Sequence, residues 1–250
     1  MRFLPQIQGI VPYTPGTPYS PAQLGVRPAP ALVQKLLVGA FGWMFAGLLL
    51  SAGVAYLVGS SQELMAAVLN WWLAIVIVQL ILGVGIQVAI NKVSPTVSLG
   101  LFFVYAASMG LTIGVIVWTV MRDPGGTQAV ASAFFSAAGM FGAAAVFGAV
   151  TKRNLSSLGG ILFMGLIGII IASVINIFLN SDALSWVISL LGVALFTALT
   201  AYDVQKITRG DYAAMTGSME RASILAALHL YLNFINLFLF FLRIFGGSRN

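Results

Sequence analysis

SILAALHLYLNFINLFLFFLRIF, residues Ser223–Phe245, is an apolar stretch long enough to cross a bilayer, since about 20 residues at 1.5 Å each span the hydrocarbon core. Four polar side chains interrupt it: His229, Asn233, Asn236 and Arg243. At about 100° per residue, their spacing places all four on one narrow face of a helix. Because unpaired polar groups in hydrocarbon cost several kcal/mol, this face must meet protein or a wet cavity. We therefore expect this helix at the centre of a bundle.

Composition indicates an integral membrane protein. The 250 residues are 60% hydrophobic and 7% charged, whereas soluble domains carry about 25% charged residues. The apolar runs are continuous rather than alternating, which predicts an all-α fold and not a β-barrel. The absence of cysteine excludes disulfides and thiolate chemistry, and one histidine with six acidic residues gives little support to a zinc site. The cationic residues are spread among the loops. This distribution is typical of the loop charges that orient a membrane protein and not of a basic face that binds nucleic acid.

The chain divides into a tail and one transmembrane domain. Residues 1–30 hold seven of the nine prolines, which predicts an extended or disordered tail and no signal peptide. On composition, a flexible tail is favoured over a Pro-rich docking ligand. Residues 31–250 are expected to form a seven-helix transmembrane domain. Its apolar runs are Leu36–Val58, Trp71–Ile90, Val97–Val120, Ala129–Val150, Ile161–Leu179, Leu184–Tyr202 and Ser223–Phe245.

Loop charges predict the orientation. Nine cationic residues fall on the N-terminal side: Arg2, Arg27, Lys35, Lys92, Lys152, Arg153, Lys206, Arg209 and Arg221. The opposite side has two, Arg122 and Arg249. The positive-inside rule therefore predicts a cytoplasmic N-terminus and, after seven crossings, a C-terminus outside.

Asp203, in LTAYDVQKI, is the only acid near membrane depth, and an intramembrane acid predicts a functional site. Thr200 precedes it by one turn, so we expect a buried polar face. The alternative is that the helix ends near Tyr202 and leaves the carboxylate in interfacial water. Candidate partners are His229, Asn233 and Lys92. Burial disfavours the charged form of a carboxylate, and a neighbouring cation favours it. The balance of these two effects predicts a contact between Asp203 and its partner that responds to pH.

Other polar residues are candidates for lining a pore. Gln79, Gly83 and Gln87 recur every four residues, which fits a wet interior or ordinary interhelical hydrogen bonding equally well. With Thr200 and Asn236 added, there are four candidates for lining a pore: Gln79, Gln87, Thr200 and Asn236. Arg243 lies two residues from the end of its run, where it either reaches the interface or plugs the outer side of a cation path.

The enzyme classes considered do not fit the chain. A retinal protein needs a Schiff-base lysine in the last helix, which has none, and a serine protease needs a serine placed beside His229. An intramembrane aspartyl protease needs two acids at membrane depth, whereas Asp211 lies in a polar loop. We therefore expect no enzyme activity.

Three linked segments resemble the Bax inhibitor-1 family: AGMFGAAAVFGAVTKRNLSSLGG (Ala138–Gly160), LTAYDVQKI (Leu199–Ile207) and LHLYLNFINLFLFFLRIFG (Leu228–Gly246). The resemblance runs from about Leu36 to Gly247 and is strongest to the bacterial inner-membrane branch. It implies a seven-helix bundle in which the last helix is central. It also implies that the bundle is a pH-sensitive Ca²⁺ leak channel. In that pattern two aspartates on the last two helices share a proton and latch to a basic residue. Asp203 matches the first aspartate and Arg243 the arginine.

The chain departs from this pattern at Asn233, which stands where the family has its second aspartate. An amide cannot ionise, so two carboxylates cannot share a proton here. Asn233 can still hydrogen-bond to Asp203 or offer its carbonyl oxygen to Ca²⁺, which makes Asp203 and Asn233 the candidate metal ligands. His229, one turn before Asn233, becomes the candidate titrating partner of Asp203.

We therefore expect a bacterial inner-membrane protein that leaks cations, with Ca²⁺ as the candidate ion. Its gating and pH-sensing residues would be Asp203, Asn233, His229, Arg243 and Lys92. Beyond the lipid bilayer we expect neither a cofactor nor a nucleic-acid partner. The alternative is a non-conducting regulator that binds another membrane protein, such as a membrane-bound AAA protease, with the Pro-rich tail as its docking segment.

Overall fold

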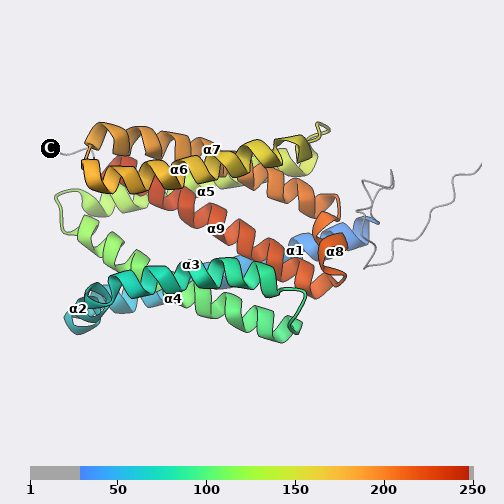
Figure 1. Ribbon diagram of the computed structural model, residues 1–250, viewed down its shortest axis with the longest axis horizontal. Coiled ribbons are helices and arrows are strands. Elements are labelled where there is room, and N and C mark those ends of the chain that lie inside the picture. The colour runs from blue at the N-terminus through green and yellow to red at the C-terminus, as the bar shows by residue number, and fades with distance from the viewer. Residues whose placement is uncertain (1–28, 248–250) are drawn as a thin grey trace, which may run out of the picture.

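The computed structural model describes residues 29–247, and the regular structure in this range is helical throughout (Figure 1). Seven of the described helices are long and apolar enough to cross a membrane, which confirms the predicted all-α, seven-helix architecture. The predicted tail, apart from Ala29 and Pro30, lies outside the described residues. The elements are α1 (Pro30–Ser60), α2 (Gln62–Asn70), α3 (Trp72–Ala89), α4 (Pro95–Met121), α5 (Gly126–Val150), η1 (Ser156–Leu158), α6 (Gly159–Leu179), α7 (Asp182–Thr208), α8 (Asp211–Thr216) and α9 (Met219–Gly246).

Polar and turn-forming residues set the helix boundaries. Proline begins α1 and α4, as expected at the first helical position, where the missing N–H costs no hydrogen bond. Four serines are N-caps, each accepting the backbone N–H three residues further on. They are Ser61 before α2, Ser94 before α4, Ser181 before α7 and Ser218 before α9.

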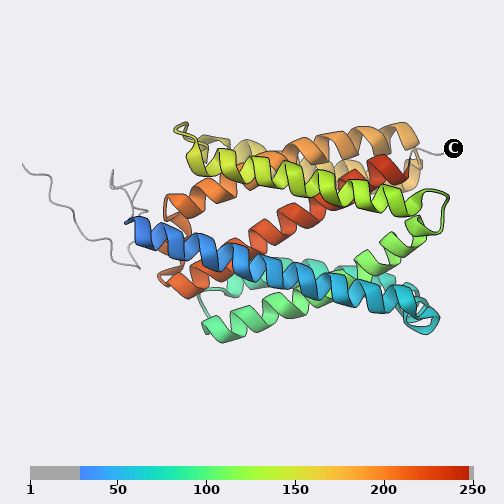
Figure 2. The ribbon, with the colours of Figure 1, turned by 180° about the vertical axis from the view of Figure 1, so that it is seen from behind.

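Helix α9 lies at the centre of the bundle. It packs against α1, α4, α5, α7 and α8, and it is the most buried of the seven spanning helices (Figures 1 and 2). By contrast, α3 packs mainly on α4, and α6 packs mainly on α7. The helix with the polar face is therefore the inner one, as the cost of polar groups in lipid requires.

Glycines bring two pairs of helices into close contact. A Cβ on Gly148 of α5 would lie 2.2 Å from the carbonyl oxygen of Ala201 in α7. A Cβ on Gly110 of α4 would lie 2.7 Å from the carbonyl oxygen of Ser51 in α1. Because backbone stands opposite backbone at both points, any side chain would push the helices apart.

The two ends of the bundle differ in content. Helix α1 begins at one end, which we call the N-terminal end, and α9 finishes at the other, which we call the α4–α5 end after its turn (Figure 1). The last turns of α7, all of α8 and the start of α9 meet at the N-terminal end. Which end faces the cytoplasm remains a prediction from the loop charges.

Replacing Gly148 by alanine should lower the free energy of unfolding by about 1–3 kcal/mol, because the added methyl group meets the α7 backbone. Thermal unfolding of the purified protein in detergent measures this as a lower Tm. The matched control is Gly142→Ala in the same helix, where a Cβ meets nothing within 4 Å. Equal Tm values for the two variants would contradict close α5–α7 packing.

Candidate functional site

Asp203 lies inside a helix and is buried. Helix α7 continues to Thr208, so the carboxylate does not follow the helix end near Tyr202. Its side chain is 8% exposed, and of the six acidic residues in the chain only Asp203 is buried. A buried charge needs polar partners, since an unpaired one is far too costly in this setting.

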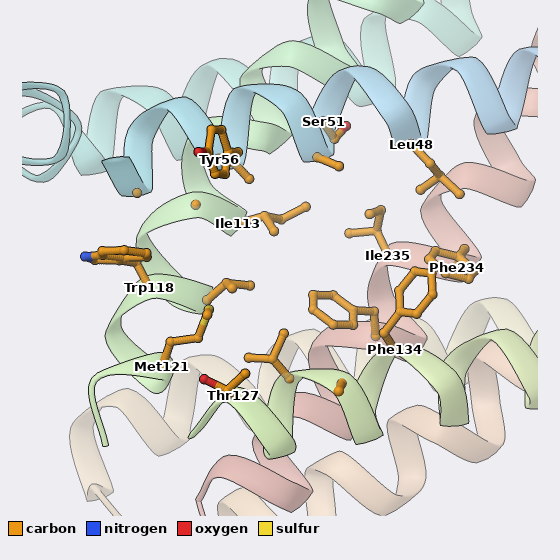
Figure 3. Close-up of a pocket in the computed structure, with 18 of the residues that line it drawn as sticks. Leu48, Ser51, Tyr56, Ile113, Trp118, Met121, Thr127, Phe134, Phe234 and Ile235 are labelled. Atoms are coloured by element: carbon orange, nitrogen blue, oxygen red, sulfur yellow. The ribbon is translucent and has the colours of Figure 1, made fainter. Parts of the chain in front are cut away.

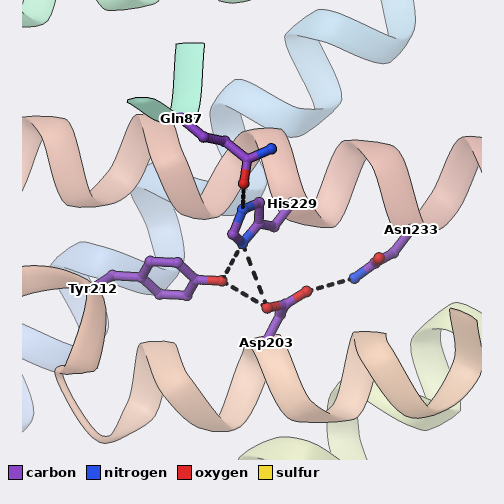
Figure 4. A network of polar contacts seen from close by, with 5 residues as sticks. All are labelled: Gln87, Asp203, Tyr212, His229 and Asn233. Carbon is purple, nitrogen blue, oxygen red and sulfur yellow. Dashed lines mark hydrogen bonds and ion pairs between the residues drawn. The ribbon is translucent and has the colours of Figure 1, made fainter. Parts of the chain in front are cut away.

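Each carboxylate oxygen of Asp203 has a hydrogen-bond donor (Figure 4). The Tyr212 hydroxyl lies 2.7 Å from Oδ1, and Nδ2 of Asn233 donates to Oδ2 at 2.8 Å. Nδ1 of His229 lies 2.6 Å from the Tyr212 hydroxyl and 3.6 Å from Oδ1 of Asp203. On the other side of the imidazole, Nε2 lies 3.0 Å from Oε1 of Gln87. We call these five residues the Asp203 cluster.

Tyr212 reaches the cluster because α8, which connects α7 to α9, packs against both helices. Gly210 and Gly217, with φ of 76° and 61°, bracket this six-residue helix in the left-handed conformation that glycine tolerates best. The Tyr212 side chain is fully buried, and Nζ of Lys206 lies 4.7 Å from its ring centroid in a cation–π contact. Sequence reasoning missed Tyr212, although glycines bracketing a short segment with one tyrosine, GDYAAMTG, were the available signal.

Tyr212 is fixed as a hydroxyl donor. Burial, and then the negative charge of Asp203, raise the pKa of the Tyr212 hydroxyl well above its ordinary value. Both effects disfavour the tyrosinate, so the hydroxyl keeps its proton across the physiological range. It therefore has one proton to give and lone pairs with which to accept.

Two of the predicted gating residues lie away from the cluster. Lys92 is exposed in the turn after α3. Arg243 is exposed in the last turn of α9, ten residues beyond Asn233 and thus about 15 Å further along the axis. Its position departs from the inward face that the spacing predicted, because a long side chain near a helix end can reach the interface.

The predicted pore-lining residues make ordinary packing contacts in this structure. Nε2 of Gln79 donates to the carbonyl oxygen of Ser108 and to the hydroxyl of Thr112, both at 2.7 Å, and so joins α3 to α4. Thr200 and Asn236 donate to backbone carbonyls one turn earlier in their own helices. Gln87 alone of this set belongs to the Asp203 cluster.

No preformed metal site accompanies Asp203 in residues 29–247. Within that range no group of three or more His, Asp or Glu side chains is placed to hold a metal ion. Asn233 turns its NH₂ group toward the carboxylate, so the pair forms a hydrogen bond rather than two oxygen ligands. A cation would have to displace these donors to reach Asp203.

The chain is similar along most of its length to an inner membrane protein and to other bacterial proteins. A family profile described as "Inhibitor of apoptosis-promoting Bax1" matches residues 33–250. The inner membrane protein YbhL of Escherichia coli strain K12 is 42% identical over 232 residues, covering 90% of this chain and 96% of the relative. A protein of Borreliella burgdorferi is 39% identical over 221 residues, covering 86% and 93%. A protein of Deinococcus radiodurans is 39% identical over 219 residues, covering 87% and 92%.

Replacing Tyr212 by phenylalanine should lower the free energy of unfolding by about 1–3 kcal/mol, because the buried Oδ1 of Asp203 loses its donor while the ring is kept. The Tm in detergent measures the effect. Tyr202→Phe is the control, since among the described residues its hydroxyl forms no hydrogen bond and only its ring meets Lys206. If both variants lose the same stability, the hydroxyl of Tyr212 does not hold the cluster.

Proposed function

Because the chain belongs to the Bax inhibitor-1 family of integral membrane proteins, we propose that it is a pH-responsive cation leak channel gated by the Asp203 cluster. Ca²⁺ is the candidate ion. The membrane setting follows from the family, from the relative named as an inner membrane protein and from the seven apolar helices. The gating mechanism rests on the proton arrangement of the cluster.

The observation that supports this proposal is that the Tyr212 hydroxyl has one proton to donate and lies between two groups that can accept it. These groups are Oδ1 of Asp203 and Nδ1 of His229. Gln87 directs its carbonyl oxygen to His229, because its NH₂ group donates to the carbonyl of Gly83 at 3.0 Å. Nε2 of His229 must therefore carry a proton. If Nδ1 is protonated too, it donates to Tyr212, which donates to an ionised Asp203. If Asp203 holds that proton instead, both bonds run the other way. The three side chains hold the same number of protons in either case, and every contact is satisfied.

Loss of one proton from this chain leaves a contact unsatisfied. With Asp203 ionised and His229 neutral, Tyr212 can donate to one neighbour and not to both. A buried group left without its partner costs about 1–3 kcal/mol. The cluster joins α3, α7, α8 and α9. Because the loss of a proton removes one bond, the full set of bonds is present at low pH and is incomplete at high pH. Opening is thus expected on the alkaline side of the transition.

Other charged groups near the cluster do not alter this count. Lys206 lies over the Tyr212 ring, and Asp211 acts on the same hydroxyl through its negative charge. The two charges are of opposite sign, and neither side chain is a link in the hydrogen-bonded chain. His229, with 22% of its side chain exposed, is the titratable member through which protons can reach the cluster.

Cation passage and gating would use the same carboxylate. Asp203 is the one buried acid of the chain, and oxygen ligands suit Ca²⁺. Both of its oxygens are occupied by donors while the cluster is intact, so a cation gains access to Oδ1 only when the Tyr212 bond is released. Asn233 supplies no second negative charge, which should make the attraction for Ca²⁺ weaker than that of two acids.

Ca²⁺ flux in proteoliposomes tests the proposal across about pH 5.5 to 8.5, a range that brackets the ordinary histidine pKa of about 6.5. Wild-type flux should rise with pH. His229→Gln should hold flux low at all pH values, because a glutamine NH₂ group can donate to Tyr212 without titrating. Asp203→Asn should lower flux throughout, because the only buried acid is lost.

The control is Asp182→Asn, which removes an acid from the first turn of the same helix at the α4–α5 end and should leave flux unchanged. Flux that falls as the pH rises would contradict the gating mechanism. Silence of the wild type and of Asn233→Asp alike would contradict conduction. That result would favour the non-conducting regulator, whose expected docking segment, residues 1–30, lies outside the described residues apart from Ala29 and Pro30.

A further inference from the structure

A long apolar groove lies on the side of α9 away from α7. Its volume is about 610 Å³, and α1, α4, α5 and α9 form its walls (Figure 3). Aliphatic and aromatic side chains line it, with Phe134 and Phe234 in edge-to-face contact at 5.9 Å between centroids. The hydroxyl of Ser51, within the groove, already bonds to the carbonyl of Ala106 and to Tyr231, each at 2.7 Å. Water would find few partners in such a space.

The groove opens sideways between spanning helices. Tyr56 of α1 and Phe135 of α5 line it and are 75% and 72% exposed, so its mouth faces the surroundings of the bundle, which for these helices is the bilayer. In Figure 2, α9 lies behind α1 and α5, whose side chains line the groove. Along α1 the lining runs from Leu48 to Gly59, about 17 Å of helix, close to the roughly 15 Å of one leaflet's hydrocarbon.

Charged and aromatic groups stand where the groove reaches the α4–α5 end. Trp118, Met121 and Thr127 line this part, and tryptophan favours the membrane interface. Arg122 and Asp123 follow directly in the turn, both exposed. Among the described residues, neither side chain forms an ion pair with another. A neighbouring cation and anion complement the phosphate and the ammonium of a zwitterionic headgroup.

We propose that this groove is a binding site for one acyl chain of a zwitterionic phospholipid, with its headgroup at Arg122 and Asp123. An empty apolar groove would forfeit the dispersion contacts of its walls, and hydrocarbon is the medium at its mouth. The acyl chain of the lipid would lie against Phe234 and Ile235 of α9 and fill the space between α1 and α5. The site is independent of the cation path and of the protons of Asp203.

A phosphatidylethanolamine that carries a photoreactive diazirine in its acyl chain tests this site in proteoliposomes of the full chain. Crosslinks mapped by mass spectrometry should concentrate on residues 48–59 and 127–135, above the level on the exposed face of α3. The double variant Ala52→Phe with Ala131→Phe fills the groove from both walls and should reduce this labelling about tenfold, which corresponds to about 1.4 kcal/mol. Arg122→Gln with Asp123→Asn should reduce the preference for this lipid over phosphatidylglycerol.

The control is Ala74→Phe on the exposed face of α3, outside the groove, which should leave the groove labelling unchanged. Labelling of α3 in the filled variant shows whether its bundle remains inserted and folded. Equal labelling of groove and α3 face in the wild type would identify ordinary surface lipid and overturn the proposal. Groove labelling that persists in the folded, filled variant, or crosslinking of the groove to a second copy of the chain, would overturn it as well.

Discussion

The hydrogen bonds to the buried Asp203 carboxylate are the constraint on which the N-terminal end of the bundle depends. An acid in an apolar interior is tolerated only when both oxygens are bonded. The donors come from α8 and α9, so α7 cannot separate from either without leaving a buried group unpaired. The same requirement explains why the spanning helix with the polar face is the most buried one. In a bilayer, polarity draws a helix inward.

Much of the fold could be predicted from hydrophobicity alone, because a lipid-facing backbone has no alternative to a helix. All seven spans and the central position of α9 follow from the apolar runs and the spacing of His229, Asn233 and Asn236. Asp203 and its contact with Asn233 were also within reach, since the polar face of the last span needs a partner and Asp203 is the one acid at membrane depth. The positions of Arg243 and Lys92 were not, because a long cationic side chain near a helix end can turn either way.

Tyr212 could not be predicted for a different reason. A six-residue helix is unstable by itself, so α8 forms only where α7 and α9 hold it. Its tyrosine stands nine residues after Asp203 and seventeen before His229 in a polar connection, where no periodicity relates the three. Only the folded chain places one hydroxyl between the acid and the imidazole. Helix α8, which completes the cluster, thus depends more on tertiary contacts than on its own sequence.

Asn233 changes how such a cluster can respond to protons. Its amide is a permanent donor, so Oδ2 of Asp203 keeps its bond in every protonation state. The consequence of losing a proton therefore falls on Oδ1 of Asp203, the Tyr212 hydroxyl and Nδ1 of His229, the contacts that hold α8 to α7 and α9. Phe234, the next residue, points to the apolar groove and touches Phe134 and Phe141. Helix α9 is thus held by polar bonds on one side and by apolar contacts on the other. Loosening of the cluster must therefore be accommodated by movement of α8, unless the apolar side yields too.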